Sequence, residues 1–234
     1  MKLHAINNRQ DGTQERILDA AEKLFMKRGF VTTSMRMITA QAQVNLSAVN
    51  YHFGSKEELI KEIFARRLGP LNRERIAHLD DLEKNAAGKP LRVEKILEAY
   101  VASALHMGGN PLQGGAVFLR LLGRAFSEPP ETIKTFLPQQ YRAVVQRFKT
   151  AFARALPHLP EQELVWRMHF MFGAVAYTLA GNDALQLICN YVLDDAQSAQ
   201  AITRHLLPFL VAGLNAPLPH LRVVRKTERL RSHA

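Results

Sequence analysis

Apolar residues recur at intervals of three and four along almost the whole chain, which is the period of amphipathic α-helices. The first such segment predicts a helix from about Thr13 to Arg28. Its expected buried face comprises Ile17, Leu18, Ala21, Leu24 and Phe25. Gly29 follows where a helix commonly ends on a residue with positive φ. No run of alternating apolar and polar residues stands out, so we expect an all-α fold.

Two short helical patterns come next. Thr33 or Ser34 can cap a second helix that runs through about Ala42 and buries Met35 and Ile38. A two-residue turn at 43–44 then leads to a third helix. The side chains expected to cap that helix and to lock it against the first two are Asn45, Leu46, Val49 and Phe53.

A fourth, longer helix is predicted to begin at Ser55, because Ser55 and Glu58 have the spacing of a capping box. Pro70 should interrupt this helix with a kink, since proline lacks the backbone donor, before helix resumes through about Leu82. Residues 85–90 are the expected linker. Further helices are predicted near residues 92–107, 113–126, 131–155, 161–180, 183–193 and 197–214.

With 234 residues, the chain can form one large domain, or a small domain followed by a large one. The single Cys189 excludes an internal disulfide and suits a reducing compartment. The first residues are polar, unlike a signal peptide, and the longest apolar run, 168–180, is too short to cross a bilayer. We therefore expect a cytoplasmic protein with no membrane partner.

The net charge of +10 is unevenly distributed. Residues 1–60 carry 8 basic and 6 acidic side chains, whereas residues 216–234 carry 5 and 1. The basic end favours a disordered tail, with a DNA-contacting extension as the alternative. Because the first 60 residues are nearly neutral, any nucleic-acid argument depends on which face carries the cations.

Residues 34–59 have the organisation of a helix-turn-helix, whose second helix lies in the major groove of DNA. The exposed positions expected on that helix are small or polar. Asparagine can read adenine through two hydrogen bonds, and alanine can contact the methyl group of thymine. The candidate base-reading residues are Asn45, Ser47, Ala48 and Asn50.

The flanking residues Tyr51, His52 and Lys56 suit contacts to phosphate oxygens. Lys56 also lies in the first turn of its helix, where free N–H groups and the helix dipole favour an anion. Arg36 can reach either a phosphate or a base. Each has a structural alternative: Tyr51 as a packing residue, His52 as a capping residue, and Arg36 as a solvated charge.

Residues 13–65 resemble the DNA-binding domain of the TetR family of bacterial transcriptional regulators. The resemblance implies that the start of the second helix, the polar residues of the third, the Tyr-His pair and the following lysine contact DNA. The matching residues here are Thr33, Ser34, Asn45, Ser47, Tyr51, His52 and Lys56. Many members have Tyr-Tyr-His where this chain has Asn50-Tyr51-His52, which implies a different contact at the first position.

Residues 1–12 are expected to form a flexible arm before the DNA-binding domain. The same resemblance implies an all-helical domain for ligand binding and dimerisation at 66–215. Segments 166–181 and 206–214 are apolar on almost every side, so a partner subunit should cover them, unless they form an ordinary monomer core. The residues expected in a four-helix dimer interface are Phe170, Ala174, Tyr177, Leu206, Phe209 and Leu210.

Arg120 and Arg124 are four residues apart in an otherwise apolar helix. Together they could hold the carboxylate or phosphate of a fatty ligand, although pairing with nearby glutamates is an equal alternative. Phe118, Leu121 and Phe126 would contact the ligand tail. This segment and others are similar to the fatty-acid-responsive TetR regulators of pseudomonads, which implies a long acyl effector.

The function we predict is a homodimeric repressor that binds a palindromic operator and leaves it when a small apolar effector binds, such as a long-chain fatty acid or acyl-CoA. One alternative is a helical enzyme acting on lipid or aromatic substrates. Against an enzyme, there is no nucleophile elbow, metal-ligand spacing or phosphate loop, and no metal or cofactor is expected. A nonspecific, nucleoid-like DNA binder is the other alternative, which the nearly neutral first domain disfavours.

Overall fold

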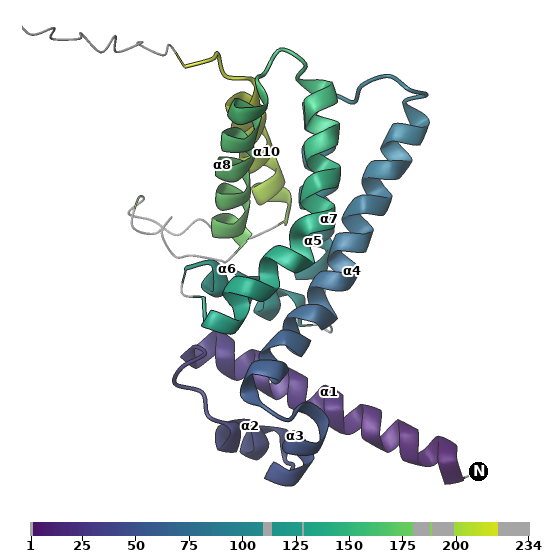
Figure 1. The fold of residues 1–234 in the computed structure, drawn as a ribbon, viewed down its shortest axis with the longest axis vertical. Coiled ribbons are helices and arrows are strands. Elements are labelled where there is room, and N and C mark those ends of the chain that lie inside the picture. The colour runs from purple at the N-terminus through teal and green to yellow at the C-terminus, as the bar shows by residue number, and fades with distance from the viewer. Residues whose placement is uncertain (1, 110–113, 128, 180–187, 189–198, 220–234) are drawn as a thin grey trace, which may run out of the picture.

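The computed structural model describes residues 2–109, 114–127, 129–179, 188 and 199–219. Within these ranges all regular structure is α-helical. Three helices form the lower end of the molecule in Figure 1. They are α1 (Lys2–Arg28), α2 (Met35–Ala42) and α3 (Leu46–Phe53).

The first helix ends as predicted but begins earlier. Gly29 has a φ of 89°, which confirms the expected end. The predicted start near Thr13 was wrong, because α1 already begins at Lys2. No proline interrupts residues 2–12, and the one glycine there, Gly12, costs a helix only about 1 kcal/mol. Most of the segment expected as a flexible arm therefore lies within a helix.

The fourth helix, α4 (Lys56–Asn85), joins the two ends of the molecule (Figure 1). Helix continues beyond Pro70 as expected, to Asn85, and the kink expected at Pro70 stays a prediction. A proline inside a helix removes one backbone hydrogen bond and crowds the carbonyl of the preceding turn, so packing must compensate. Leu68 and Leu71 are both buried and hold the helix on either side of that gap.

The remaining helices follow the predicted segments closely. They are α5 (Val93–Gly108), α6 (Gly115–Ser127), α7 (Glu131–Ala155), α8 (Glu161–Leu179) and α10 (Ala199–Asn215). Helices α8 and α10 pack side by side, at the end of the molecule away from α2 and α3 (Figure 1). The helix predicted near 183–193 lies outside the described residues, apart from Ile188. None of the described helices is long and apolar enough to cross a membrane.

Two apolar cores hold these helices together. The lower core joins α1–α4 to α6 and the start of α7, and the upper core joins α4, α5, α7, α8 and α10. In the lower core the Phe64 and Phe118 rings meet edge to face with their centroids 5.6 Å apart. Helix α6, although far along the sequence, is therefore packed into the core of the first domain.

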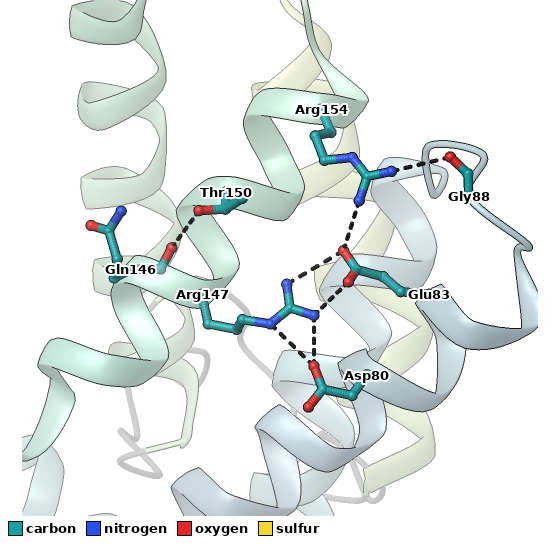
Figure 2. Close-up of polar contacts among 7 residues, drawn as sticks. All are labelled: Asp80, Glu83, Gly88, Gln146, Arg147, Thr150 and Arg154. Atoms are coloured by element: carbon teal, nitrogen blue, oxygen red, sulfur yellow. Dashed lines mark hydrogen bonds and ion pairs between the residues drawn. The ribbon is translucent and has the colours of Figure 1, made fainter.

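Polar contacts fasten the upper part of α4 to α7 (Figure 2). The Arg147 guanidinium donates to Asp80 at 2.6 Å and also to Glu83, while Arg154 pairs with Glu83 and donates to the carbonyl of Gly88. Hydrogen bonds to Glu83, and then Asp80, hold the pKa of Arg147 above its usual value. This ion-pair cluster anchors α4 at the end opposite to α3.

Candidate nucleic-acid interface

Each helix of the helix-turn-helix, and the helix after it, begins with a side-chain cap. The Ser34 hydroxyl accepts from the backbone N–H of Met37 at 3.3 Å, and Asn45 Oδ1 accepts from Ala48 at 2.7 Å. Ser55 accepts from Glu58 at 3.1 Å, but the Glu58 carboxylate pairs with Lys61. Of the two hydrogen bonds in the predicted capping box at α4, the one accepted by Ser55 is therefore present, and the Glu58 carboxylate is directed to Lys61 instead.

Helix α3 is held by fewer side chains than predicted. Val49 and Phe53 are buried in the lower core, as expected. Leu46 was expected to pack there too, but it is 42% exposed. Leu46 is the first residue of α3, and a helix of two turns buries only the one stripe that carries residues 49 and 53.

The opposite face of α3 is open to solvent. Asn45, Ser47, Asn50 and Tyr51 are exposed, and Ala48 and His52 are half-buried. Tyr51 is 76% exposed, which rules out the packing role considered for it. Its ring meets the His52 ring edge to face at 5.3 Å between centroids. The face therefore presents small and polar groups from a helix whose N-terminus is already capped.

Thr33 is a positioning residue in this structure. Its side chain is fully buried, and its hydroxyl donates to the carbonyl of Gly29 at 2.8 Å. A second contact to the carbonyl of Leu24 is longer, at 3.3 Å. These contacts fix the loop between α1 and α2 and point the side chain away from the exposed face, so Thr33 cannot offer its side chain to DNA as the resemblance implied. Ser34, the next residue, is exposed.

Two cations flank the exposed face of α3. Arg36 is exposed on the first turn of α2. Lys56 is the first residue of α4, with its ammonium 3.5 Å from the carbonyl oxygen of Val31 and 5.9 Å from the centre of the Phe25 ring. These weak contacts hold the ammonium near the N-terminus of α4, where an anion is favoured.

The structure does not bring the predicted ligand residues together. Phe118 and Leu121 are fully buried in the lower core, and Arg120 is exposed. Arg124 donates from Nη1 to the carbonyl of Met26 at 3.0 Å, near the end of α1. Phe126, of this set, lines the cavity described below. Arg124 is directed to the end of α1, and neither arginine lines the cavity described below, so the predicted head-group site is not supported by this structure.

A cavity of about 230 Å³ lies between α4, α5, α6, α7 and α8. Most of its wall is apolar, and three polar side chains also reach it, Arg75, Tyr100 and Tyr141. The sequence reasoning missed all three. A signal was available for Arg75, because it continues the i, i+3, i+7 spacing of the buried residues Leu68 and Leu71. A charged residue at a core position marks a functional candidate.

Helices α8 and α10 present an exposed apolar face. Phe170, Tyr177 and Phe209, all predicted for the dimer interface, are more than half exposed. Trp166, the first residue of the apolar segment 166–181, stacks on Phe170 with ring centroids 5.8 Å apart. Ala174 is half-buried.

Two other residues predicted for this interface are directed elsewhere. Leu206 and Leu210 are buried in the upper core of the same chain. Their placement in the interface was therefore wrong, because the face of α10 that packs on α5 and α8 is also apolar. In the described part of the chain, no group of three or more His, Cys, Asp or Glu side chains could hold a metal ion.

Comparison with known proteins agrees with this arrangement. The sequence model of the bacterial regulatory proteins of the tetR family matches residues 17–63, and a tetracyclin repressor-like C-terminal domain matches residues 98–213. Over 59 residues, 25% of this chain, the sequence is 36% identical to two regulators of Pseudomonas putida, TtgW, an uncharacterized HTH-type transcriptional regulator, and SrpR. The matches span 44% and 28% of those two proteins.

Solved structures share the fold over most of the chain. The hemolysin II transcriptional regulator HlyIIR has a TM-score of 0.58 and 18% identity, with 86% of this chain and 98% of that chain covered. SmeT in complex with triclosan has a TM-score of 0.59 and 20% identity, with 88% and 99% covered. The fatty acid degradation regulator FadR of Bacillus halodurans has a TM-score of 0.55 and 17% identity, with 87% of this chain and 96% of that chain covered.

Both halves of the chain therefore match one group of proteins. The N-terminal match covers the helix-turn-helix, and the C-terminal match covers α6, α7, α8 and most of α5, which line the cavity together with α4. This group consists of DNA-binding regulators, so the enzyme alternative is set aside. The chain belongs to the TetR family of bacterial transcriptional regulators.

Proposed function

We propose that this protein is a homodimeric repressor that binds a palindromic operator through α3 and leaves it when an apolar effector binds. The observation that carries the proposal is the exposed, polar face of α3 at the end of the molecule, flanked by Arg36 and Lys56. A short helix with small side chains can approach base edges closely, and the two cations suit the adjacent phosphates. Such a repressor acts in the cytoplasm, where the DNA is.

The residues divide by role in this proposal. Ser47, Ala48 and Asn50 read base edges, since they lie along the exposed face of the capped helix. The remaining contacts go to phosphates and set the position of α3 in the groove. They come from Ser34, Arg36, Asn45, Tyr51, His52 and Lys56.

Binding measured on two duplexes tests this division. A duplex selected by the protein from a random pool serves as the operator, and a scrambled duplex as its control. Lys56→Ala should weaken binding to both by about tenfold and lower the salt slope by about one, since one phosphate contact is lost. Asn50→Ala should weaken binding to the selected duplex alone. An unchanged affinity and salt slope for Lys56→Ala would contradict the proposed docking.

The exposed apolar face of α8 and α10 is the proposed dimer interface. Soluble monomers rarely leave large apolar side chains grouped in this way. Here Trp166, Phe170 and Tyr177 follow one stripe of α8, and Phe209 extends it on α10. Pairing with the same face of a second copy forms a four-helix interface with twofold symmetry. The symmetry matches the two half-sites of a palindromic operator.

The effector is proposed to bind in the cavity between α4 and α8, whose apolar wall suits a fatty acid or an acyl-CoA. Leu119 and Leu122 of α6 and Leu137 of α7 contribute both to this wall and to the lower core. A ligand that displaces them acts directly on the packing of the DNA-binding domain. It releases DNA to the extent that it binds the displaced conformation more tightly.

A further inference from the structure

One buried arginine at the cavity has no acidic partner in the described part of the chain. Arg75 on α4 is 3% exposed and lines the cavity. Its guanidinium lies 3.9 Å above the centre of the Tyr100 ring, and its Nε donates to the backbone carbonyl of Tyr100 at 3.0 Å. The contacts hold the planar group in place without balancing its charge.

The other contacts of Arg75 are also to neutral groups. Nη1 donates to Asn72 Oδ1 at 3.4 Å, and the neutral Tyr141 side chain lines the same cavity as the guanidinium. A second buried arginine in the described part of the chain, Arg167, is different, because it pairs with Glu163 at 2.8 Å and donates to the backbone carbonyl of Leu214 near the end of α10. A buried charge without a counter-ion is costly, so an anion that reaches it gains affinity.

The surroundings of Arg75 favour a small, planar anion. A guanidinium can donate two parallel hydrogen bonds to one carboxylate. Burial raises the pKa of the Tyr141 hydroxyl, which therefore stays protonated and able to donate beside the arginine. The rest of the wall is apolar, with Leu122, Phe126 and Val175 among its members.

We propose that Arg75 is the anion-recognising residue of this cavity, which takes a compact apolar molecule with one free carboxylate. This inference rests on the effector site proposed above and narrows its ligand. An apolar cavity of about 150 Å³ holds benzene, so the 230 Å³ here corresponds to roughly nine non-hydrogen atoms. A free acid of that size fits, whereas the head group of an acyl-CoA does not.

Calorimetric titration of the full-length protein tests the proposal. The probes are octanoate and 3-phenylpropionate, which represent fatty and aromatic acids, and 1-octanol, which has the octanoate tail without the charge. The variants are Arg75→Met, Arg75→Lys and the control Arg73→Met, which removes an exposed arginine of the same helix. Thermal unfolding verifies that each variant is folded.

The wild type and Arg73→Met should bind at least one acid at least tenfold more tightly than 1-octanol. Arg75→Met should lose that preference and keep its affinity for 1-octanol. Arg75→Lys should show an intermediate preference, because lysine keeps the positive charge but lacks the paired N–H donors of a guanidinium. The acid that binds more tightly shows whether the cavity prefers a fatty or an aromatic carboxylate. If Arg75→Met does not fold, the wild-type preference and Arg75→Lys decide the question.

Three results would overturn the proposal: no binding of either acid, no preference of the wild type for either acid over 1-octanol, or unchanged acid affinity in Arg75→Met. Operator release is measured separately. Acid binding without release would leave the Arg75 site intact and contradict the repressor mechanism. Specific operator binding without acid binding would contradict the Arg75 site and leave the proposed DNA-binding function intact.

Discussion

At the scale of single residues, the recognition surface depends on caps. The Asn45 side chain accepts a hydrogen bond from the backbone N–H of Ala48, in the first turn of α3. This helix has only 8 residues and packs through Val49 and Phe53. Short helices have little intrinsic stability, so each cap carries a large share of it. The geometry of the proposed base-reading face is therefore tied to Asn45, the residue that begins the helix.

We expect Asn45→Ala to lower the free energy of unfolding by about 1 kcal/mol, because the Ala48 N–H loses its acceptor. Denaturant unfolding measures the change. Asn45→Asp keeps the acceptor and should retain the stability while weakening DNA binding through its negative charge. Equal stability of the alanine variant and the wild type would contradict the importance of the cap.

Single residues were predicted from the sequence where a local rule acts. The cap at Asn45 and the positive φ of Gly29 follow from spacing alone. The burial of Thr33, the exposure of Leu46 and the direction of Arg124 depend on packing between distant segments. Such contacts leave no periodic signal in the sequence.

At the scale of elements, α4 and α6 connect the two ends of the molecule. Helix α4 is anchored to α7 by the Arg147 cluster, and α6 reaches α1 through Arg124. Met26, whose carbonyl accepts from Arg124, lies in the last turn of α1. The guanidinium thus caps the negative end of that helix.

Arg147→Met should lower the free energy of unfolding by about 1 kcal/mol, since its partners are partly exposed and screened by solvent. The difference between variant and wild type should shrink as salt is added. Thermal unfolding at low and high salt measures it, with Arg142→Met, an exposed arginine of the same helix, as the control. A loss that does not change with salt would contradict an ion-pair role.

Arg124→Met should lower the free energy of unfolding by about 1 kcal/mol through the lost contact to Met26, without changing octanoate affinity. The sequence-based interpretation assigned Arg124 to the ligand, so this variant separates the two roles. Calorimetry and thermal unfolding on the same sample give both values. Weaker acid binding at unchanged stability would restore the earlier interpretation.

Helix boundaries in the described ranges were largely predictable, because apolar periodicity and the glycine and proline residues mark them. The continuity of α4 through Pro70 was not, since the buried neighbours that hold it come from other helices. The position of α6 in the lower core was not predictable either, because packing between helices far apart in the sequence depends on how their side-chain surfaces fit together.

At the scale of the whole molecule, the proposed function depends on joining the DNA-binding ends of two copies at a fixed spacing. The sequence predicted an interface on α8 and α10 from their apolar character. The sequence could not show which of the two apolar faces of α10 faces a partner. One face packs in the upper core of the same chain, and the other, with Phe209, is exposed.

Phe209→Arg should separate the dimer, because each copy would bury an unpaired charge in the interface. Sedimentation should show a monomer, and operator affinity should fall at least 100-fold since one half-site alone remains bound. Arg204→Phe changes an exposed position of α10 outside the proposed stripe and serves as the control. A wild type that sediments as a monomer would refute the dimer.

Selection of duplexes from a random DNA pool by the purified protein, at physiological salt and with excess competitor DNA, tests the central claim most directly. We predict enrichment of a palindrome whose half-sites are centred about one helical turn, roughly 34 Å, apart or somewhat more. The Asn50→Ala variant should enrich a different half-site. A pool that stays random, with all duplexes bound equally and lost together as salt rises, would contradict the account.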